Sequence, residues 1–230
     1  MLAGGVEQDD ASGWSIFDAL FVFNRKSNDN PSAASRPMSA SAAGFIPTGG
    51  AGVVVIENLD SALERGAHIY AEILSGSNSC GAQKNRGSMT YPNDEAAQRC
   101  IVEAINQSGI KPQDIQLVNG HFTGTKADPV EYKNWVEAFR SFGIDLPIVQ
   151  ASKSLFGHGL GAAGSIEICT VLNQFEKGYI HPNINCEDLH PTIAEYTDGS
   201  NLLNQTIEHN ALNCAIKASF GFGDVNSCIN

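Results

Sequence analysis

The stretch Ser152-Lys153-Ser154-Leu155-Phe156-Gly157-His158-Gly159-Leu160-Gly161-Ala162-Ala163-Gly164 says most about how this chain folds. It follows an apolar run at 147–150 and ends in very small residues, so we expect a buried strand, a turn and a closely packed helix. The turn carries Lys153 and His158, five residues apart. Since most lysines lie at the surface, a lysine between a buried strand and a buried helix indicates a fixed role.

Two further glycine-rich turns carry polar or aromatic side chains. An expected strand at 116–119 delivers His121, Thr123 and Thr125 into one loop. An apolar strand at 213–219 runs into Ser219-Phe220-Gly221-Phe222-Gly223-Asp224-Val225-Asn226. Three such turns, each following a strand, predict one composite active site.

Strands and helices alternate along most of the chain. Residues 1–50 are rich in Ser, Ala, Asn and Gly and are expected to be irregular, and residues 51–230 to form the main domain. We expect strands at 53–57, 69–74, 116–119, 147–150 and 213–219, and helices at 60–65, 93–105, 128–139 and from the glycine-rich turn to about 175. This alternation predicts an α/β layered fold.

Composition narrows the class of protein. The 230 residues are 42% hydrophobic and 17% charged, which favours a folded domain over disorder. A net charge of -11 without a basic run argues against nucleic-acid binding. The six cysteines are scattered and include no Cys-x-x-Cys pair, as is usual for reduced thiols. With no signal peptide or membrane-spanning run in the sequence, a cytoplasmic protein is expected.

The two histidines of these turns suit one kind of chemistry. His158 is expected at a helix N-terminus, where the helix dipole disfavours a positive charge and keeps the imidazole neutral. A neutral imidazole can donate a hydrogen bond to a developing oxyanion, and His121 could do the same from its own loop. The alternative for His121 is a histidine that merely satisfies backbone groups in a turn. The alternative for Asp128 is a helix cap.

Two other kinds of site are less well supported by the sequence. Residues 159–164 match the dinucleotide fingerprint Gly-x-Gly-x-x-Gly, but about eight residues separate them from the strand, whereas the fingerprint follows its strand directly. A helix reduced to small residues for close packing explains them better. His181, Cys186 and His190 fit no common zinc spacing, so no metal site is predicted.

These motifs resemble those of the β-ketoacyl-acyl carrier protein synthases, and they occur in the same order. The matching segments are Ala3-Gly4-Gly5, Asn28-Asp29-Asn30-Pro31, Gly44-Phe45, His121-x-Thr123-x-Thr125, Lys153-Ser154-x-x-Gly157-His158, Gly161-Ala162-Ala163-Gly164 and Phe220-Gly221-Phe222-Gly223. The resemblance implies a thiolase-like α/β/α/β/α fold and decarboxylative Claisen condensation of an acyl thioester with malonyl carrier protein, in fatty-acid or polyketide synthesis. It also implies a dimer and no cofactor beyond the pantetheine arm of the acyl carrier protein.

The resemblance assigns roles to individual residues. His121 and His158 match the histidines that assist decarboxylation and stabilise the enolate, and Lys153 matches the active-site lysine. Glu131 matches the glutamate that pairs with that lysine, with Asp128 beside it as structural support. The residues expected to contact substrate or to gate its entry are Thr123, Thr125, Phe122, Gly221 and Phe222.

The chain also departs from the family pattern. The family nucleophile is a cysteine in a Thr-Ala-Cys setting upstream of Ala-Gly-Gly, and none of the six cysteines has that setting. Phe122 replaces the usual glycine after the histidine, and Asp224 replaces the last glycine of the Gly-Phe-Gly turn. The chain therefore resembles the C-terminal half of a condensing enzyme, with residues 1–50 completing the N-terminal half and lining the acyl pocket.

Three hypotheses follow from these observations. In the first, the chain is a β-ketoacyl synthase half whose partner, the nucleophile-bearing N-terminal half, supplies the cysteine within a homodimer or heterodimer. In the second, it is a non-catalytic partner similar to a chain-length factor. Retention of both histidines and Lys153 favours the first. The third, a nucleotide-binding oxidoreductase, rests on residues 159–164 and is disfavoured by their spacing.

Overall fold

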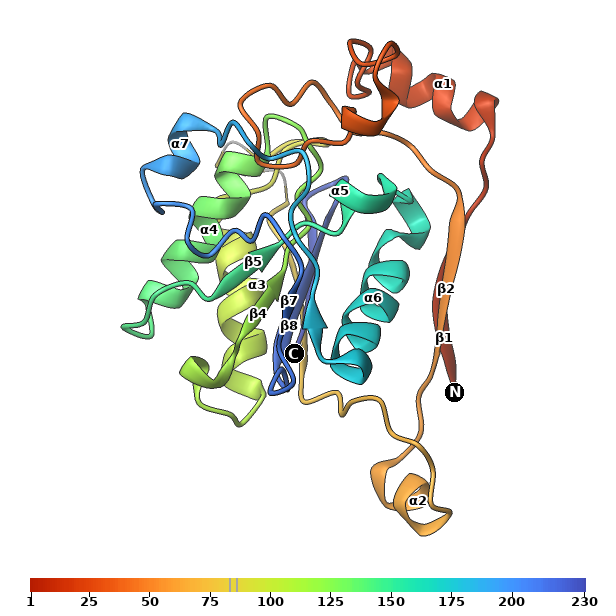
Figure 1. Cartoon of the computed structure of the whole chain (residues 1–230), viewed down its shortest axis with the longest axis vertical. Helices are drawn as coiled ribbons and strands as arrows, with labels where there is room; N and C mark the ends of the chain where they lie inside the picture. The colour runs from red at the N-terminus through yellow and green to blue at the C-terminus, as the bar shows by residue number, and fades with distance from the viewer. Residues whose placement is uncertain (83, 86) are drawn as a thin grey trace.

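A mixed sheet lies at the centre of the computed structural model, which describes residues 1–82, 84–85 and 87–230 (Figure 1). Among these residues the strand order is β3-β9-β8-β4-β5. The strand bounds are Gly76–Cys80 for β3, Leu117–Asn119 for β4, Ile148–Gln150 for β5, Ala215–Gly221 for β8 and Val225–Ile229 for β9. Strands β8, β4 and β5 are parallel, and β9 is antiparallel to its neighbours β8 and β3. The carboxyl ends of β4, β5 and β8 therefore meet at one edge.

Further layers cover both faces of this sheet (Figure 1). Helices α3 (Asp94–Gln107) and α4 (Asp128–Arg140) lie on one face, and α6 (Ala163–Lys177) lies on the other. A two-stranded antiparallel sheet of β1 (Leu2–Glu7) and β2 (Gly50–Val55) packs on the far side of α6. The order helix, sheet, helix, sheet confirms the predicted α/β layering.

The close approach of α6 to β1 and β2 depends on glycine residues, which have no side chain. A Cβ placed on Gly52 would lie 2.5 Å from the carbonyl carbon of Ser165 and 2.6 Å from the amide nitrogen of Ile166. A Cβ on Gly5 would collide with the carbonyl oxygen of Gly161. Glycines are therefore needed on the strands where they meet the backbone of residues 161–166.

The first 50 residues contain more regular structure than the sequence predicts. They include β1 and helix α1 (Ala11–Ala19), whose N-terminus is capped by the Asp10 carboxylate. The prediction of an irregular segment is thus wrong for these two elements, and it holds for most of residues 20–49. Residues 2–7 form a strand because they pair with residues 50–55, on the other side of the predicted boundary. This pairing stabilises an extended backbone even though Ala3-Gly4-Gly5 is rich in glycine.

Most predicted elements of the main domain are present, but one strand is displaced. Asn93 caps α3 by accepting from the amide of Ala96, as predicted. The strand predicted at 69–74 is wrong, since Ile69 and Ile73 are exposed and the strand is the polar β3 that follows. Pairing with β9 decides this, together with the Ser79 hydroxyl, which donates to the Ala96 carbonyl.

Short elements connect these layers. They are η1 (Pro31–Ala33), α2 (Leu59–Glu64), η2 (Pro112–Asp114), α5 (Lys153–Phe156), η3 (Leu160–Ala162), α7 (Pro191–Ala194) and the pair β6 (Tyr179–Ile180) and β7 (Ile207–Glu208). The main core lies between the sheet and helices α3 and α4, around the fully buried Tyr132, Trp135 and Phe139. Within the part of the chain that the structure describes, no helix combines the length and apolar character needed to cross a bilayer.

Substituting Gly52 tests the contact between β2 and α6. Gly52→Ala should lower the free energy of unfolding by about 1–3 kcal/mol, because the added methyl group meets backbone atoms that cannot rotate away. Gly13→Ala is the matched control, since its Cβ would meet nothing closer than 3.7 Å in an exposed helix. The control should be neutral or stabilising by about 0.5–1 kcal/mol. Urea denaturation of both variants decides the matter, and equal effects would contradict the proposed close contact.

Candidate active site

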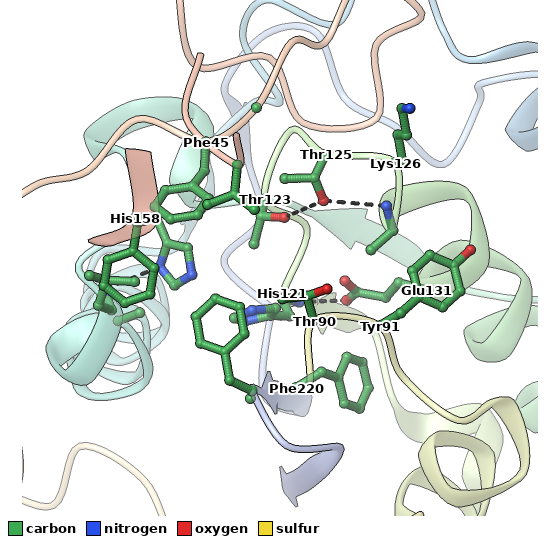
Figure 2. Close-up of a pocket in the computed structure, with 18 of the residues that line it drawn as sticks. Phe45, Thr90, Tyr91, His121, Thr123, Thr125, Lys126, Glu131, His158 and Phe220 are labelled. Atoms are coloured by element: carbon green, nitrogen blue, oxygen red, sulfur yellow. Dashed lines mark hydrogen bonds between the residues drawn. The ribbon is translucent and has the colours of Figure 1, made fainter. Parts of the chain in front are cut away.

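A cavity of about 920 Å³ lies at the sheet edge where β4 and β8 end (Figure 2). Its lining includes the two histidines of the glycine-rich turns and the residues around them. Of the predicted site residues, those that line the cavity are His121, Thr123, Thr125, Glu131, His158, Gly221 and Phe222. The separate turns are therefore brought together in one place.

His121 and His158 both line this cavity, and their rings pack edge to face. Their ring centroids are 5.2 Å apart and the rings are nearly perpendicular, at 82°. His121 follows β4, and His158 follows α5 after strand β5. Adjacent parallel strands thus deliver the two rings to the same edge, which is where ligands bind in open α/β sheets.

Hydrogen bonds to Nδ1 define the tautomer of each ring. The amide of Leu160 donates to Nδ1 of His158 at 3.1 Å. The Lys153 ammonium lies 3.4 Å from Nδ1 of His121 and donates to the His121 carbonyl at 2.6 Å. A nitrogen that accepts carries no proton, so each neutral ring holds its proton on Nε2. Among the residues that the structure describes, neither Nε2–H group has a hydrogen-bond partner, so both rings can donate to a ligand.

The surroundings keep both rings uncharged. Burial, followed by the charge of Lys153, holds the pKa of His121 well below its usual value. Burial and the same lysine also hold the pKa of His158 well below that value. Two neutral imidazoles with available donors are suited to binding a developing oxyanion.

Lys153 is fully buried behind His121, and its partner differs from the predicted one. The ammonium forms an ion pair with Glu167 on α6, and no direct ion pair with Glu131 is present among the described residues. The predicted pairing with Glu131 is wrong because that carboxylate is turned toward the backbone of the histidine loop. Burial lowers the pKa of Lys153, and the charge of Glu167 opposes this shift.

Glu131 supports the histidine loop instead. Its Oε1 accepts from the amide of His121 at 2.5 Å (Figure 2). The same oxygen accepts from the indole N–H of Trp135 at 3.2 Å. Burial, with the charge of Asp128 next, raises the pKa of Glu131 to about 8. The carboxyl group is therefore an acceptor that fixes the start of the loop.

Asp128 shapes the same loop. It is the first residue of α4, but its carboxylate accepts from the amides of Thr123 and Gly124 at 2.8 and 2.9 Å, and from the amide of Met38 at 2.8 Å. No cap bond from this side chain to the first turn of α4 is present within the described structure. Asp128 thus ties the histidine loop to the N-terminal segment, a support role wider than the simple helix cap.

Hydroxyl and aromatic groups complete the cavity wall. The hydroxyls of Thr123 and Thr125 lie 2.9 Å apart, on the side of His121 away from Phe220 (Figure 2). Phe222 stacks on Phe17 of α1, with ring centroids 5.6 Å apart and an angle of 21° between the rings. Phe45 packs edge-on against His158 at 4.9 Å. One side of the cavity is therefore polar and the other apolar.

Phe122 does not contact the cavity, and its prediction as a substrate-binding residue is wrong. It is fully buried and packs near Tyr132, with ring centroids 6.3 Å apart. A Cβ on Gly120 would lie 2.5 Å from Cδ2 of the Phe122 ring, so this glycine makes room for it. Along the extended loop, His121 and Thr123 face the cavity while Phe122 faces the core.

Sequence reasoning missed Glu167, Phe17 and Phe45 as residues of the site. Glu167 had a usable signal, because it lies between Ile166 and Ile168 in a helix of small and apolar residues. A charge in such a position is expected to be buried and paired. Phe17 had no local signal, since only the packing of α1 brings it to the cavity.

The fold defines the class of protein. The ketosynthase in the complex AntDE:AntF, solved with its type II polyketide acyl-carrier protein, matches with a TM-score of 0.88 and 28% identity over 100% of this chain and 55% of that chain. The ishigamide ketosynthase/chain length factor matches with a TM-score of 0.83 and 27% identity over 99% and 52%. The mixed α/β fold is thus that of ketosynthases, as predicted.

The sequence assigns the family. Residues 70–187 match the family described as "Beta-ketoacyl synthase, C-terminal domain". The 3-oxoacyl-[acyl-carrier-protein] synthase 1 of Haemophilus influenzae is 35% identical over 229 residues, which cover 100% of this chain and 53% of that protein. The chain belongs to the β-ketoacyl synthase family, and it spans about half the length of the curated relatives it matches.

The raised pKa of Glu131 makes a prediction about pH. Between its ordinary pKa of 4.5 and its folded value of about 8, the folded protein holds a proton that the unfolded chain releases. The free energy of unfolding therefore falls as pH rises through this window. Glu131→Gln keeps the acceptor oxygen and does not titrate, so its stability relative to wild type should increase by on the order of 1–3 kcal/mol from about pH 5 to about pH 8.

Urea denaturation across that pH range measures this difference. Glu137→Gln, on the same helix but with a side chain that is 41% exposed, is the matched control and should follow wild type at every pH. A Glu131→Gln curve parallel to wild type would show that this carboxyl group is ionised throughout.

Proposed function

We propose that this chain supplies the decarboxylation and enolate-binding part of a β-ketoacyl-acyl carrier protein synthase active site. One observation carries the proposal: two neutral imidazoles, each with Nδ1 occupied, face one cavity from adjacent turns. The family to which the chain belongs supports this reading. Fatty-acid and polyketide condensing enzymes both use this chemistry.

The proposed reaction has two stages, a decarboxylation that breaks one carbon–carbon bond and a condensation that forms another. The bond between the carboxylate carbon and Cα of a malonyl thioester breaks, carbon dioxide leaves, and the electron pair becomes an enolate whose oxygen accepts from the Nε2–H groups of His121 and His158. The enolate carbon then attacks the carbonyl of an acyl thioester on a cysteine, and that thiolate leaves as the new carbon–carbon bond forms. Each oxyanion donor of this kind is worth about 10²–10³ in rate.

The neighbouring residues take positioning roles in this proposal. Lys153 holds His121 through its carbonyl and Nδ1, and the ion pair with Glu167 holds Lys153. Thr123 and Thr125 offer hydroxyls to the amides of a pantetheine arm. Phe222 gates the entrance with Gly221 before it, and the backbone N–H of Phe222 serves the acyl oxyanion.

The nucleophile is proposed to come from another polypeptide segment. No cysteine is found among the described residues that line the cavity, and the acyl-enzyme needs a thiolate. Leu2, Val6, Val53 and Val55 are each more than half exposed on β1 and β2, which suits them to packing against a nucleophile-bearing half. A homodimer or heterodimer that docks an acyl carrier protein completes the proposed assembly.

A non-catalytic partner subunit is the second candidate. The similarity to a structure containing a chain length factor favours it, as does a cavity without a cysteine among its described residues. The ordered tautomers of both histidines favour the catalytic reading, because a subunit that only shapes a tunnel has no use for two N–H donors.

Histidine variants separate the two candidates. The chain is combined with a nucleophile-bearing N-terminal half of a relative, and release of carbon dioxide from malonyl carrier protein is measured. His121→Ala and His158→Ala should each lower this rate by about 10²–10³, because each removes an oxyanion donor. His68→Ala is the control, since that side chain is 61% exposed. Equal rates in all four proteins would support the non-catalytic partner.

A further inference from the structure

We propose that Lys217 on β8 is a second positioning residue of this site, which holds the far oxygen of Glu167 and adds a positive charge behind the two histidines. Its purpose rests on the proposed function, whereas its geometry is independent of that function. None of the motifs in the turns includes this residue. The structure alone brings it to the charge cluster.

Lys217 is buried and fully engaged. It is 6% exposed, and its ammonium lies 2.7 Å from Oε2 of Glu167, while Lys153 pairs with Oε1. The contact with Oε2 is an ion pair whose angles fall outside hydrogen-bond geometry. The ammonium also donates to the carbonyl of Ala218 and, at 2.7 Å, to the hydroxyl of Ser219.

The cluster holds more positive than negative charge. Glu167 is already paired by Lys153, so a second lysine is not needed to neutralise it. Burying a second ammonium group carries a desolvation cost that the single carboxylate of Glu167, shared with Lys153, offsets only in part. A retained excess ammonium therefore has to be explained by something other than pairing.

Other titratable groups also surround the histidines. Burial raises the pKa of Glu131 to about 8, which favours its neutral form, and the carboxylate of Asp128 is engaged by three backbone amides. Cys228, on the neighbouring strand β9, also has its pKa raised well above the usual value by burial. The remaining groups are the neutral His158, the paired Lys153 and the charged residues Glu7, Lys26 and Lys126, which line the same cavity. The carboxylate of Glu7 accepts from the amide of Gly161 at 3.0 Å. All of these groups are common to wild type and the Lys217 variants, so a difference in histidine titration reports the charge of Lys217.

A positive charge at this position acts on the reaction in two ways. It disfavours protonation of His121 and His158, which lie within its field, and so keeps their Nε2–H groups as neutral donors. It also favours negative charge that develops on an oxygen bound between them. Both effects are electrostatic and do not require Lys217 to touch the substrate.

Lys217 also orients a hydroxyl of the cavity wall. Ser219 lines the cavity and accepts from the Lys217 ammonium, so its own hydroxyl proton must point elsewhere. A Cβ on Gly164 would lie 3.2 Å from the Ser219 oxygen, so α6 leaves little free space beside it. Lys217 therefore places a positive charge beside the cavity and also sets the direction in which the Ser219 hydroxyl can donate.

Histidine titration tests this inference without requiring catalysis. Imidazole ¹⁵N signals of His121 and His158 are followed by NMR as pH is lowered, in the whole chain, with His121→Ala and His158→Ala for assignment. In Lys217→Met both rings should gain their protons about one pH unit higher than in wild type, the shift typical of removing a nearby like charge. Lys217→Arg keeps the charge and should titrate like wild type.

Controls separate electrostatics from structure. Lys177→Met removes an exposed lysine at the end of α6 and should leave both titrations unchanged. Lys217→Gln, uncharged but able to donate to Ser219, replaces Lys217→Met if the latter does not fold. Unchanged histidine titration in the uncharged variants would overturn the inference, even if their thermal stability fell. Failure of carbon dioxide release by the wild-type assembly would instead reject the proposed function and leave this result standing.

Discussion

The ammonium group of Lys153 is the contact on which the rest of the site depends. It joins the carbonyl and Nδ1 of His121 to the carboxylate of Glu167, so it links two residues from different parts of the chain. A buried lysine is stable only with such partners, because desolvation alone favours its neutral form. The same ammonium group therefore fixes the ring position and tautomer of His121 and holds α6, through Glu167, against the site.

The layered fold supplies the backbone geometry that this arrangement needs. Parallel β4, β5 and β8 bring their carboxyl ends to one edge, and α6 carries Glu167 beneath it. On α6 the buried positions include Glu167 and Gln174, which face polar groups rather than a purely apolar sheet. The Gln174 side chain bonds Gln150 on β5, so polar contacts position the helix against the sheet at two levels.

The sequence allowed prediction of those parts of the structure that depend on local pattern. The strands before His121 and Lys153 and the cap at Asn93 follow from periodicity and turn chemistry. The ion-pair partner of Lys153 was not predictable in the same way. Glu131 and Glu167 were both possible partners, and the packing of α6 against the sheet selects Glu167. β3 was missed because strand pairing, rather than an apolar run, defines it. Phe122 faces the core because side chains alternate between the two sides of an extended backbone. The sequence contains this pattern, but the prediction for Phe122 followed its place next to His121 in the motif instead.

The glycine contacts between the outer strands and α6 set a boundary for any long, flexible ligand. Where Gly52 meets the backbone of Ser165 and Ile166, even one methyl group has no space. Under the proposed function, a hydrocarbon tail in the cavity therefore cannot pass between β2 and α6 at that level. The apolar wall open to it is the one formed by Phe17, Phe45 and Phe222.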